Sequence, residues 1–295
     1  MKSITKCTKY ILIISIIAYL PILSAKTLIS CSHPELCKLA EFTFKENQML
    51  DFEFVSLVKI VGDPHEYEPR NAEVKNLINA DILITGPAEL NPWIKKVNYQ
   101  RSKNTNLKTI LLPLNKTDLA LYAKDGTLPT SEALSHFWLY PKVMCSIKTN
   151  LEKQLVALKM LVVLPSNKAC LPLAEKIEAD LRVTLSTVNF PLVLTHDALL
   201  PLLEKLSQRD TQIVAIKGSG HHQETTPKAV KNLYDALRGP RVIWIEEESI
   251  RVPQNVLAKK RSTDITIKID TAHSEGPSLF PVLVELNEKL KANKI

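Results

Sequence analysis

Residues 71–85, NAEVKNLINADILIT, contain the clearest pattern for the fold class. In its first part, Val74, Leu77 and Ile78 recur at helical spacing and share one face of an amphipathic helix. Its last residues, 82–85, form a short apolar run, which is typical of a strand buried on both faces. A helix that leads directly into such a strand is a building unit of parallel sheets, so the stretch predicts an α/β fold.

The same alternation of strands and helices extends through the rest of the chain. The clearest further helix covers residues 227–238 and is opened by Pro227. Short runs rich in β-branched residues and leucine predict strands at 27–30, 52–61, 109–112, 192–194, 213–216, 242–245 and 265–269. Because helical segments separate most of these runs, the strands are expected to be parallel.

A long amphipathic segment, residues 171–188, divides the strands into two sets. Its apolar residues recur at four-residue spacing, at Leu173, Ile177, Leu181 and Leu185. We therefore predict two Rossmann-like α/β lobes with parallel sheets, joined by one long helix, with the ligand in the cleft between them. The predicted division is a signal peptide at 1–25, an N-terminal α/β lobe at 26–168, the linking helix at 169–188 and a C-terminal α/β lobe at 189–295.

Composition excludes several classes of protein. Of the 295 residues, 45% are hydrophobic and 23% charged, too apolar for a disordered chain and too mixed for a protein that spans a membrane many times. Only 7 glycines occur, without a glycine-rich phosphate-binding motif. The formal charge of +7 falls to +4 without the three lysines of the first 25 residues, and no basic run exceeds residues 259–261. We therefore expect no nucleic-acid partner.

The N-terminus has the pattern of a secretory signal peptide. Three lysines precede an apolar run at 11–23, and Leu-Ser-Ala at 23–25 offers a cleavage site before Lys26. The apolar run is shorter than the roughly 20 residues of a spanning helix. We therefore predict export to the periplasm. Residues 28–31, LISC, look like a lipid-attachment box, but Lys26 interrupts the apolar lead-in, so lipid anchoring at Cys31 is the lesser alternative.

Four cysteines remain after the signal peptide: Cys31, Cys37, Cys145 and Cys170. An even number in an oxidising compartment permits two disulfides, but the spacing does not choose among the three pairings or exclude four free thiols. Because no Cys-x-x-Cys occurs, cysteine-based metal or redox chemistry is disfavoured.

Histidine and aspartate stand where predicted strands end. His65, in the segment GDPHEYEP at 62–69, and His196 each lie between a strand and a helix, and Asp270 directly follows the strand at 265–269. His136 precedes another helical segment. The carboxyl ends of parallel strands face the ligand crevice, and three imidazoles with one carboxylate can close a tetrahedral Zn²⁺ shell. The sequence therefore predicts a metal site of His65, His136, His196 and Asp270, shared between the lobes.

At these positions the sequence resembles the zinc- and manganese-binding solute-binding proteins of ABC importers. The similarity rests on GDPHEYEP at 62–69, HFWL at 136–139 and THDA at 195–198, and it runs over nearly the whole mature chain. It implies two lobes joined by a long helix, with the metal held by His65, His136, His196 and Asp270. It also implies a monomer without enzymatic activity that delivers the ion to a membrane permease driven by a cytoplasmic ATPase.

The chain departs from that family's pattern at two positions. Tyr140 replaces the aspartate of the second motif, so a hydrogen bond from that aspartate needs another source. Pro201 stands where members usually have a Gly-aromatic pair, and it is tolerable only in the first turn of a helix. The histidine- and acid-rich loop of many zinc-specific members is also missing.

Several alternatives stay open at this point. Three nitrogen ligands favour Zn²⁺, whereas Mn²⁺ prefers oxygen-rich shells and is the alternative cargo, with iron behind it. Glu66, His273, Glu275 or a water could complete the shell in place of Asp270. A zinc hydrolase is disfavoured because no His-Glu-x-x-His occurs, and a surface adhesion protein would need an anchor.

The remaining histidines and the tryptophans are given ordinary roles. His33 is expected to be a surface or cleft-lining residue, with a position near the site as the lesser alternative. His221 and His222 are expected to lie in a solvated polar loop, with an auxiliary low-affinity metal contact as the alternative. Trp93, Trp138 and Trp244 are expected to be packing residues rather than a binding box.

Overall fold

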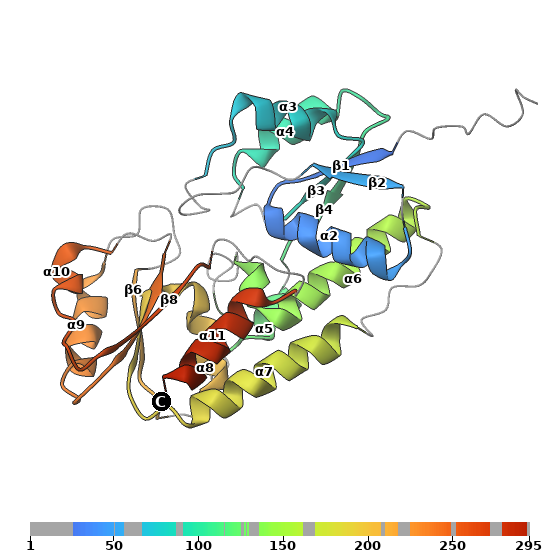
Figure 1. Ribbon diagram of the computed structural model, residues 1–295. Coiled ribbons are helices and arrows are strands. Elements are labelled where there is room, and N and C mark those ends of the chain that lie inside the picture. Colours follow the sequence, from blue (N-terminus) through green and yellow to red (C-terminus); the bar gives the residue numbers. More distant parts are fainter. Residues whose placement is uncertain are drawn as a thin grey trace, which may run out of the picture.

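The computed structural model contains two four-stranded sheets, one in each lobe (Figure 1). It describes residues 26–49, 51–55, 67–86, 91–114, 116–124, 127, 129, 136–161, 169–207, 210–217, 225–248, 252–271 and 279–293. The first sheet has the order β2-β1-β3-β4 and the second β6-β5-β7-β8. All pairings within the two sheets are parallel, which confirms the predicted α/β fold.

Each of the eight strands in the described residues overlaps a predicted run, and of the run at 52–61 residues 56–61 lie outside the described residues. Those of the first sheet are β1 (Thr27–Cys31), β2 (Phe52–Val55), β3 (Ile82–Thr85) and β4 (Lys108–Leu111). Those of the second are β5 (Leu192–His196), β6 (Ile213–Lys217), β7 (Ile243–Glu247) and β8 (Ile265–Ile269). β5 extends two residues beyond the predicted run, so that His196 is its last residue.

Strand register brings the ends of the second sheet to one edge. His196 lies opposite Lys217 on β6, and Glu247 opposite Ile269 on β8. In a parallel sheet the carboxyl ends of neighbouring strands meet at the same edge. The register therefore places His196, Glu247 and the residues that follow β8, beginning with Asp270, together at the edge where a ligand is expected.

Helices cover the sheets and begin at the positions that their sequences favour. Five of them, α2, α6, α8, α9 and α11, have proline in the first turn, where its missing N–H costs no hydrogen bond. Pro201 is one of these, in the position the sequence required of it. The helices are α2 (Pro34–Glu46), α3 (Asn71–Asn79), α4 (Ile94–Arg101), α5 (Lys116–Ala120), α6 (Pro141–Ala157), α7 (Cys170–Ser186), α8 (Leu200–Leu206), α9 (Pro227–Ala236), α10 (Gln254–Leu257) and α11 (Pro281–Ala292), with 3-10 turns η2 (Phe137–Leu139) and η3 (Asp197–Leu199).

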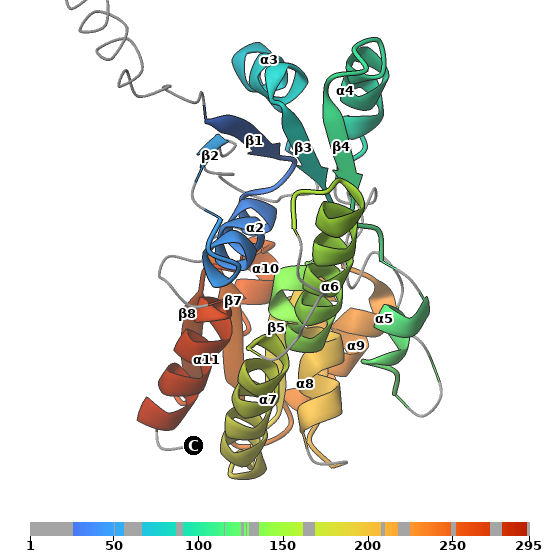
Figure 2. The ribbon, with the colours of Figure 1, turned by 90° about the vertical axis from the view of Figure 1, so that its right-hand side faces the viewer.

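The two lobes share one apolar core. α6 and α7 contact each other, and Figure 2 shows them in succession along one side of the molecule. The core is continuous from Ile29 of β1, through Leu151 of α6 and Leu181 of α7, to Ile245 of β7. α7 corresponds to the predicted linking helix, whereas the domain boundaries at 25, 168 and 188 stay predictions.

Two disulfides settle the cysteine pairing that the sequence left open. Cys31 at the end of β1 bonds Cys37 of α2, with 5.5 Å between the Cα atoms. Cys145 of α6 bonds Cys170 at the start of α7, with 5.6 Å between the Cα atoms. The second bond ties together the two helices that run along the lobes.

None of the helices in the described residues is long and apolar enough to cross a membrane. The predicted signal peptide, residues 1–25, lies outside the described residues.

Candidate metal site

His136 and His196 meet where the two lobes contact each other. Their ring centroids are 5.2 Å apart with the rings at 75°, and the residues are only 1% and 2% exposed. His136 precedes η2, which leads into α6, whereas His196 is the last residue of β5. The structure thus brings together two of the four predicted ligands, one from each predicted lobe.

Of the other two predicted ligands, the structure describes Asp270 but not His65. Asp270 directly follows β8, at the sheet edge that also carries His196. His65 and the alternative ligands Glu66, His273 and Glu275 lie outside the described residues. Within the described part of the chain, no group of three or more His, Cys, Asp or Glu side chains is arranged to hold a metal ion. The four-ligand set therefore stays a prediction.

Glu247 contacts His196, a contact that the sequence alone did not predict. Its Oε2 atom lies 3.2 Å from Nδ1 of His196 and also accepts a hydrogen bond from the Thr271 hydroxyl. Its backbone N–H donates to the Thr195 hydroxyl at 3.0 Å. All four residues are buried. Alternation along β7 decides its role, because neighbouring Glu246 instead pairs with Lys260 at 2.6 Å.

The contact with Glu247 determines which nitrogen of His196 can bind a metal. An ionised carboxylate accepts hydrogen bonds and donates none, so with Glu247 ionised this contact requires the proton on Nδ1 of His196. The lone pair is then on Nε2, which lies 3.7 Å from Oδ1 of Asp197. Metal-binding histidines commonly donate their other N–H to a carboxylate in this way, which sets the tautomer and the ring direction.

Trp138 and Tyr140, which follow His136, each donate a hydrogen bond to a backbone carbonyl of the C-terminal lobe. The Trp138 indole N–H donates to the Thr271 carbonyl at 2.7 Å, and the Tyr140 hydroxyl donates to the Ala198 carbonyl. Burial raises the pKa of the Tyr140 hydroxyl well above its ordinary value, and the charges of Asp197 and Glu247 raise it further. Tyr140 therefore stays a neutral donor, and in place of the family's aspartate this chain has a bond across the lobe contact.

His33 is buried rather than at the surface. It is 0% exposed, and its ring stacks on that of Trp138 with 4.3 Å between centroids. Its Nδ1 accepts a hydrogen bond from the Glu35 N–H at 3.2 Å and so caps α2. Trp138 in turn contacts His136 edge to face at 5.2 Å. The expected packing role of Trp138 is confirmed. Of the two roles expected for His33, the surface position is wrong, because its ring is buried against Phe137 and Trp138.

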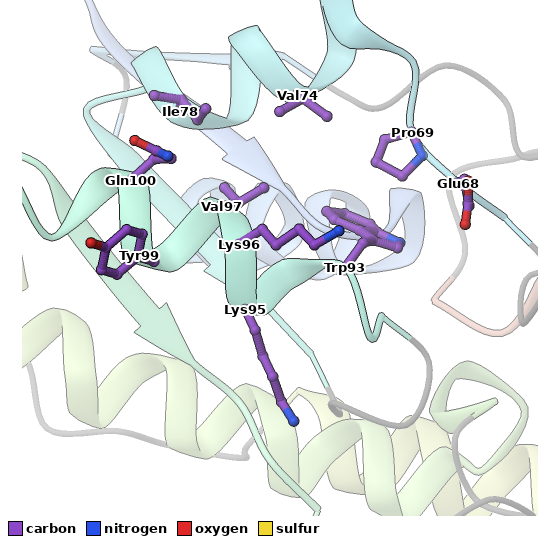
Figure 3. A pocket seen from close by; sticks show the side chains of 10 residues that line it. All are labelled: Glu68, Pro69, Val74, Ile78, Trp93, Lys95, Lys96, Val97, Tyr99 and Gln100. Carbon is purple, nitrogen blue, oxygen red and sulfur yellow. The ribbon is translucent and has the colours of Figure 1, made fainter.

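The larger cavities found among the described residues do not include the histidine pair. A groove of about 740 Å³ runs between α3 and α4, lined by Val74, Ile78, Trp93 and Val97 with lysine and tyrosine side chains at its edge (Figure 3). None of the predicted ligands that the structure describes lines this groove. A smaller cavity of about 440 Å³ is lined by Thr195, residues 246–248 and Lys268, so it borders Glu247.

Solved structures with this fold are binding proteins of several descriptions. The laminin-binding protein Lmb of Streptococcus agalactiae, described as having adhesin and metal-transporting activity, matches with a TM-score of 0.65 at 17% identity over 91% of this chain and 98% of that one. The periplasmic zinc-binding protein TroA from Treponema pallidum matches with a TM-score of 0.62 at 16% identity over 90% and 98%. At these identities the matches show the fold alone.

Sequence relatives and a family model carry the assignment further. The iron ABC transporter substrate-binding lipoprotein MtsA of Streptococcus pyogenes is 24% identical over 73% of this chain and 72% of its own. The metal ABC transporter substrate-binding lipoprotein FimA of Streptococcus parasanguinis is 25% identical over 76% and 75%. The model of the zinc-uptake complex component A, periplasmic, matches residues 50–285. The chain therefore belongs to this family of substrate-binding proteins of metal importers.

Proposed function

We propose that this protein captures a divalent transition metal outside the cytoplasm, with Zn²⁺ as its cargo, and delivers the ion to the permease of an ABC importer and its ATPase. The observation that carries the proposal is the buried contact between His136 and His196, which come from opposite lobes. An ion bound by both rings would join the lobes, and a permease that separates the lobes would release it. The protein acts as a monomer in this scheme.

Zinc is favoured by the donors rather than by the names of relatives. His65, His136 and His196 would supply three nitrogens and Asp270 one oxygen, a set that suits tetrahedral Zn²⁺. Mn²⁺ prefers more oxygen ligands and is the alternative. Similar proteins are described with different metals, since MtsA is an iron ABC transporter component and the structure of FpvC from Pseudomonas aeruginosa is a complex with Mn²⁺.

The arrangement supports binding rather than catalysis. A shell closed by four protein donors leaves no position for the reactive water that a zinc hydrolase needs. The hydrogen bonds of Trp138 and Tyr140 would hold the lobes together before the metal arrives, so little of the binding free energy is spent on closing them.

A soluble periplasmic form is favoured over a lipoprotein by the position of Cys31. Lipid attachment at this residue would make it the N-terminus and remove Thr27–Ser30, yet these residues pair with both β2 and β3 in the middle of the first sheet. Cys31 is also 0% exposed and bonded to Cys37. We therefore place the mature N-terminus at Lys26.

Titration calorimetry on the mature protein, purified without a histidine tag, tests the proposal. One tight Zn²⁺ site is expected, weakened at least about 100-fold in His136→Ala and in His196→Ala, because each removes a ligand. His221→Ala, in the loop predicted to be solvated, is the matched control and should bind as the wild type does. Unchanged affinity in both His136 and His196 variants would contradict the assignment, and tighter Mn²⁺ than Zn²⁺ binding would change the cargo.

A further inference from the structure

A chain of buried hydrogen bonds leads from the N-terminal lobe to His196. Trp138 donates to the carbonyl of Thr271 at 2.7 Å, the hydroxyl of Thr271 donates to Glu247, and Oε2 of Glu247 lies 3.2 Å from Nδ1 of His196. Each of these side chains is at most 4% exposed. Resting on the proposed function, we infer that Glu247 is a positioning residue that holds His196 in the tautomer and orientation needed to bind the metal.

The charge balance around Glu247 separates it from the structural glutamates of this protein. Glu152 pairs with Lys148 at 2.6 Å, and Glu178 pairs with Lys142 at 3.0 Å. Among the described residues, the basic side chain within ion-pair range of Glu247 is His196 alone. A buried carboxylate without a cationic partner is costly. A metal cation on the far nitrogen of His196 would place a positive charge one imidazole ring away from Glu247, so this carboxylate is suited to a loaded site.

Thr271 fixes Glu247 in turn. Its hydroxyl and the His196 ring meet the same carboxylate oxygen, so rotation of the carboxylate would break both contacts. The Thr271 backbone is held by Trp138, two residues from His136 in sequence. The orientation of a ligand in one lobe therefore depends on a side chain beside a ligand in the other. Such outer contacts typically contribute 10- to 100-fold in metal affinity.

Paired substitutions on β7 test this role. In a chelator competition titration, Glu247→Leu is expected to weaken Zn²⁺ binding about 10- to 100-fold. Glu247→Gln should lose less, because its amide oxygen can still accept from Nδ1. Glu246→Leu removes the same charge from the neighbouring position, which faces Lys260, and should bind as the wild type does. Equal losses in Glu247→Leu and Glu246→Leu, or none in either, would overturn the inference.

A double-mutant cycle separates this inference from the proposed function. If Glu247 acts through His196, Glu247→Leu will cause no further loss in the His196→Ala background. A full additional loss there would show that Glu247 acts elsewhere and would overturn the inference. If His196→Ala alone leaves affinity unchanged, the failure belongs to the ligand assignment in the proposed function.

The histidine tautomer is a readout that general destabilisation does not mimic. Nitrogen-15 NMR of the folded, metal-free protein should show His196 with its proton on Nδ1, and Glu247→Leu should shift it toward the other tautomer. If Glu247→Leu does not fold, Thr271→Val carries the test, since it keeps the shape and removes only the hydroxyl. It is expected to weaken Zn²⁺ binding several-fold. Wild-type affinity and tautomer in both Thr271→Val and Glu247→Gln would overturn the inference.

Discussion

The hydroxyl of Tyr140 donates a hydrogen bond to the backbone carbonyl of Ala198, two residues after His196. Tyr140 follows the turn that carries His136, so this bond ties the segments behind both histidines to each other. It is fully buried, and the raised pKa of the hydroxyl keeps the donor proton in place. The departure from the family's motif at this position thus supplies a direct contact between the lobes.

Tyr140→Phe removes this bond and leaves the Ala198 carbonyl buried without its donor. We expect the free energy of unfolding to fall by about 1–3 kcal/mol, the cost of an unsatisfied buried acceptor, measured by urea denaturation. Zn²⁺ affinity should fall several-fold as well, because the segment after His196 loosens. Tyr234→Phe, on an exposed tyrosine of α9, is the control and should change stability by less than about 0.5 kcal/mol. Equal stability of the two variants would contradict a role for the Tyr140 hydroxyl.

The mature protein is expected to begin at Lys26. Export from a cell with a signal peptidase should give a product whose N-terminal peptide starts KTLISC, measured by mass spectrometry. A lipid-modified N-terminus at Cys31 would mean that β1 loses most of its length, because it spans Thr27–Cys31. Detection of that product would show both the proposed periplasmic form and the role of β1 in the sheet to be wrong.

The two disulfides should differ in their contribution to stability. Cys145 and Cys170 are separated by 25 positions, and Cys31 and Cys37 by 6. A longer loop has more conformational entropy to lose in the unfolded chain when it is cross-linked. The Cys145–Cys170 disulfide should therefore contribute about 3.5 kcal/mol to stability and the Cys31–Cys37 disulfide about 2 kcal/mol. Urea denaturation of the two double alanine variants measures the difference. A larger loss for the Cys31–Cys37 pair would contradict the loop-entropy explanation.

The lowered pKa of Asp264 makes the stability of the folded protein depend on pH in the acid range. Burial alone would raise the pKa of Asp264, but hydrogen bonds from Arg261, from the Trp244 indole and from the Val242 N–H together lower it. The unfolded chain then binds this proton more readily than the folded one, so the contribution is complete above the ordinary aspartate pKa of about 3.9 and is lost as pH falls through the lowered value.

The Asp264→Asn variant tests whether ionised Asp264 stabilises the folded protein. At pH 7 the variant should be less stable than the wild type by about 1–3 kcal/mol, and the difference should shrink as pH falls below about 4. Asp235→Asn, whose partner Arg238 is on the surface, is the control and should change stability by less than about 1 kcal/mol. A difference between Asp264→Asn and the wild type that grows toward acid would contradict the lowered pKa.

The eight strands, the parallel α/β fold and the candidate ligands at strand ends could all be predicted from the amino-acid sequence. Apolar periodicity and strand-ending residues are local properties, so each run, such as Ile82–Thr85, can be recognised without its neighbours. The motif around His196 was recognisable for the same reason, because its strand, histidine and following turn are contiguous. His65 and the complete ligand set stay predictions.

The contacts between distant segments could not be predicted from the sequence and are seen in the folded structure alone. The approach of His136 to His196, the burial of His33 under Trp138 and the two disulfide pairings all depend on how the lobes and helices lie against each other. Glu247 is the clearest case, since three successive glutamates look alike in sequence. Alternation along β7 directs Glu247 toward His196 and Glu246 toward Lys260. The sequence gives the chemical type of each side chain. Which side chains become partners depends on the packing of segments that are far apart in the sequence.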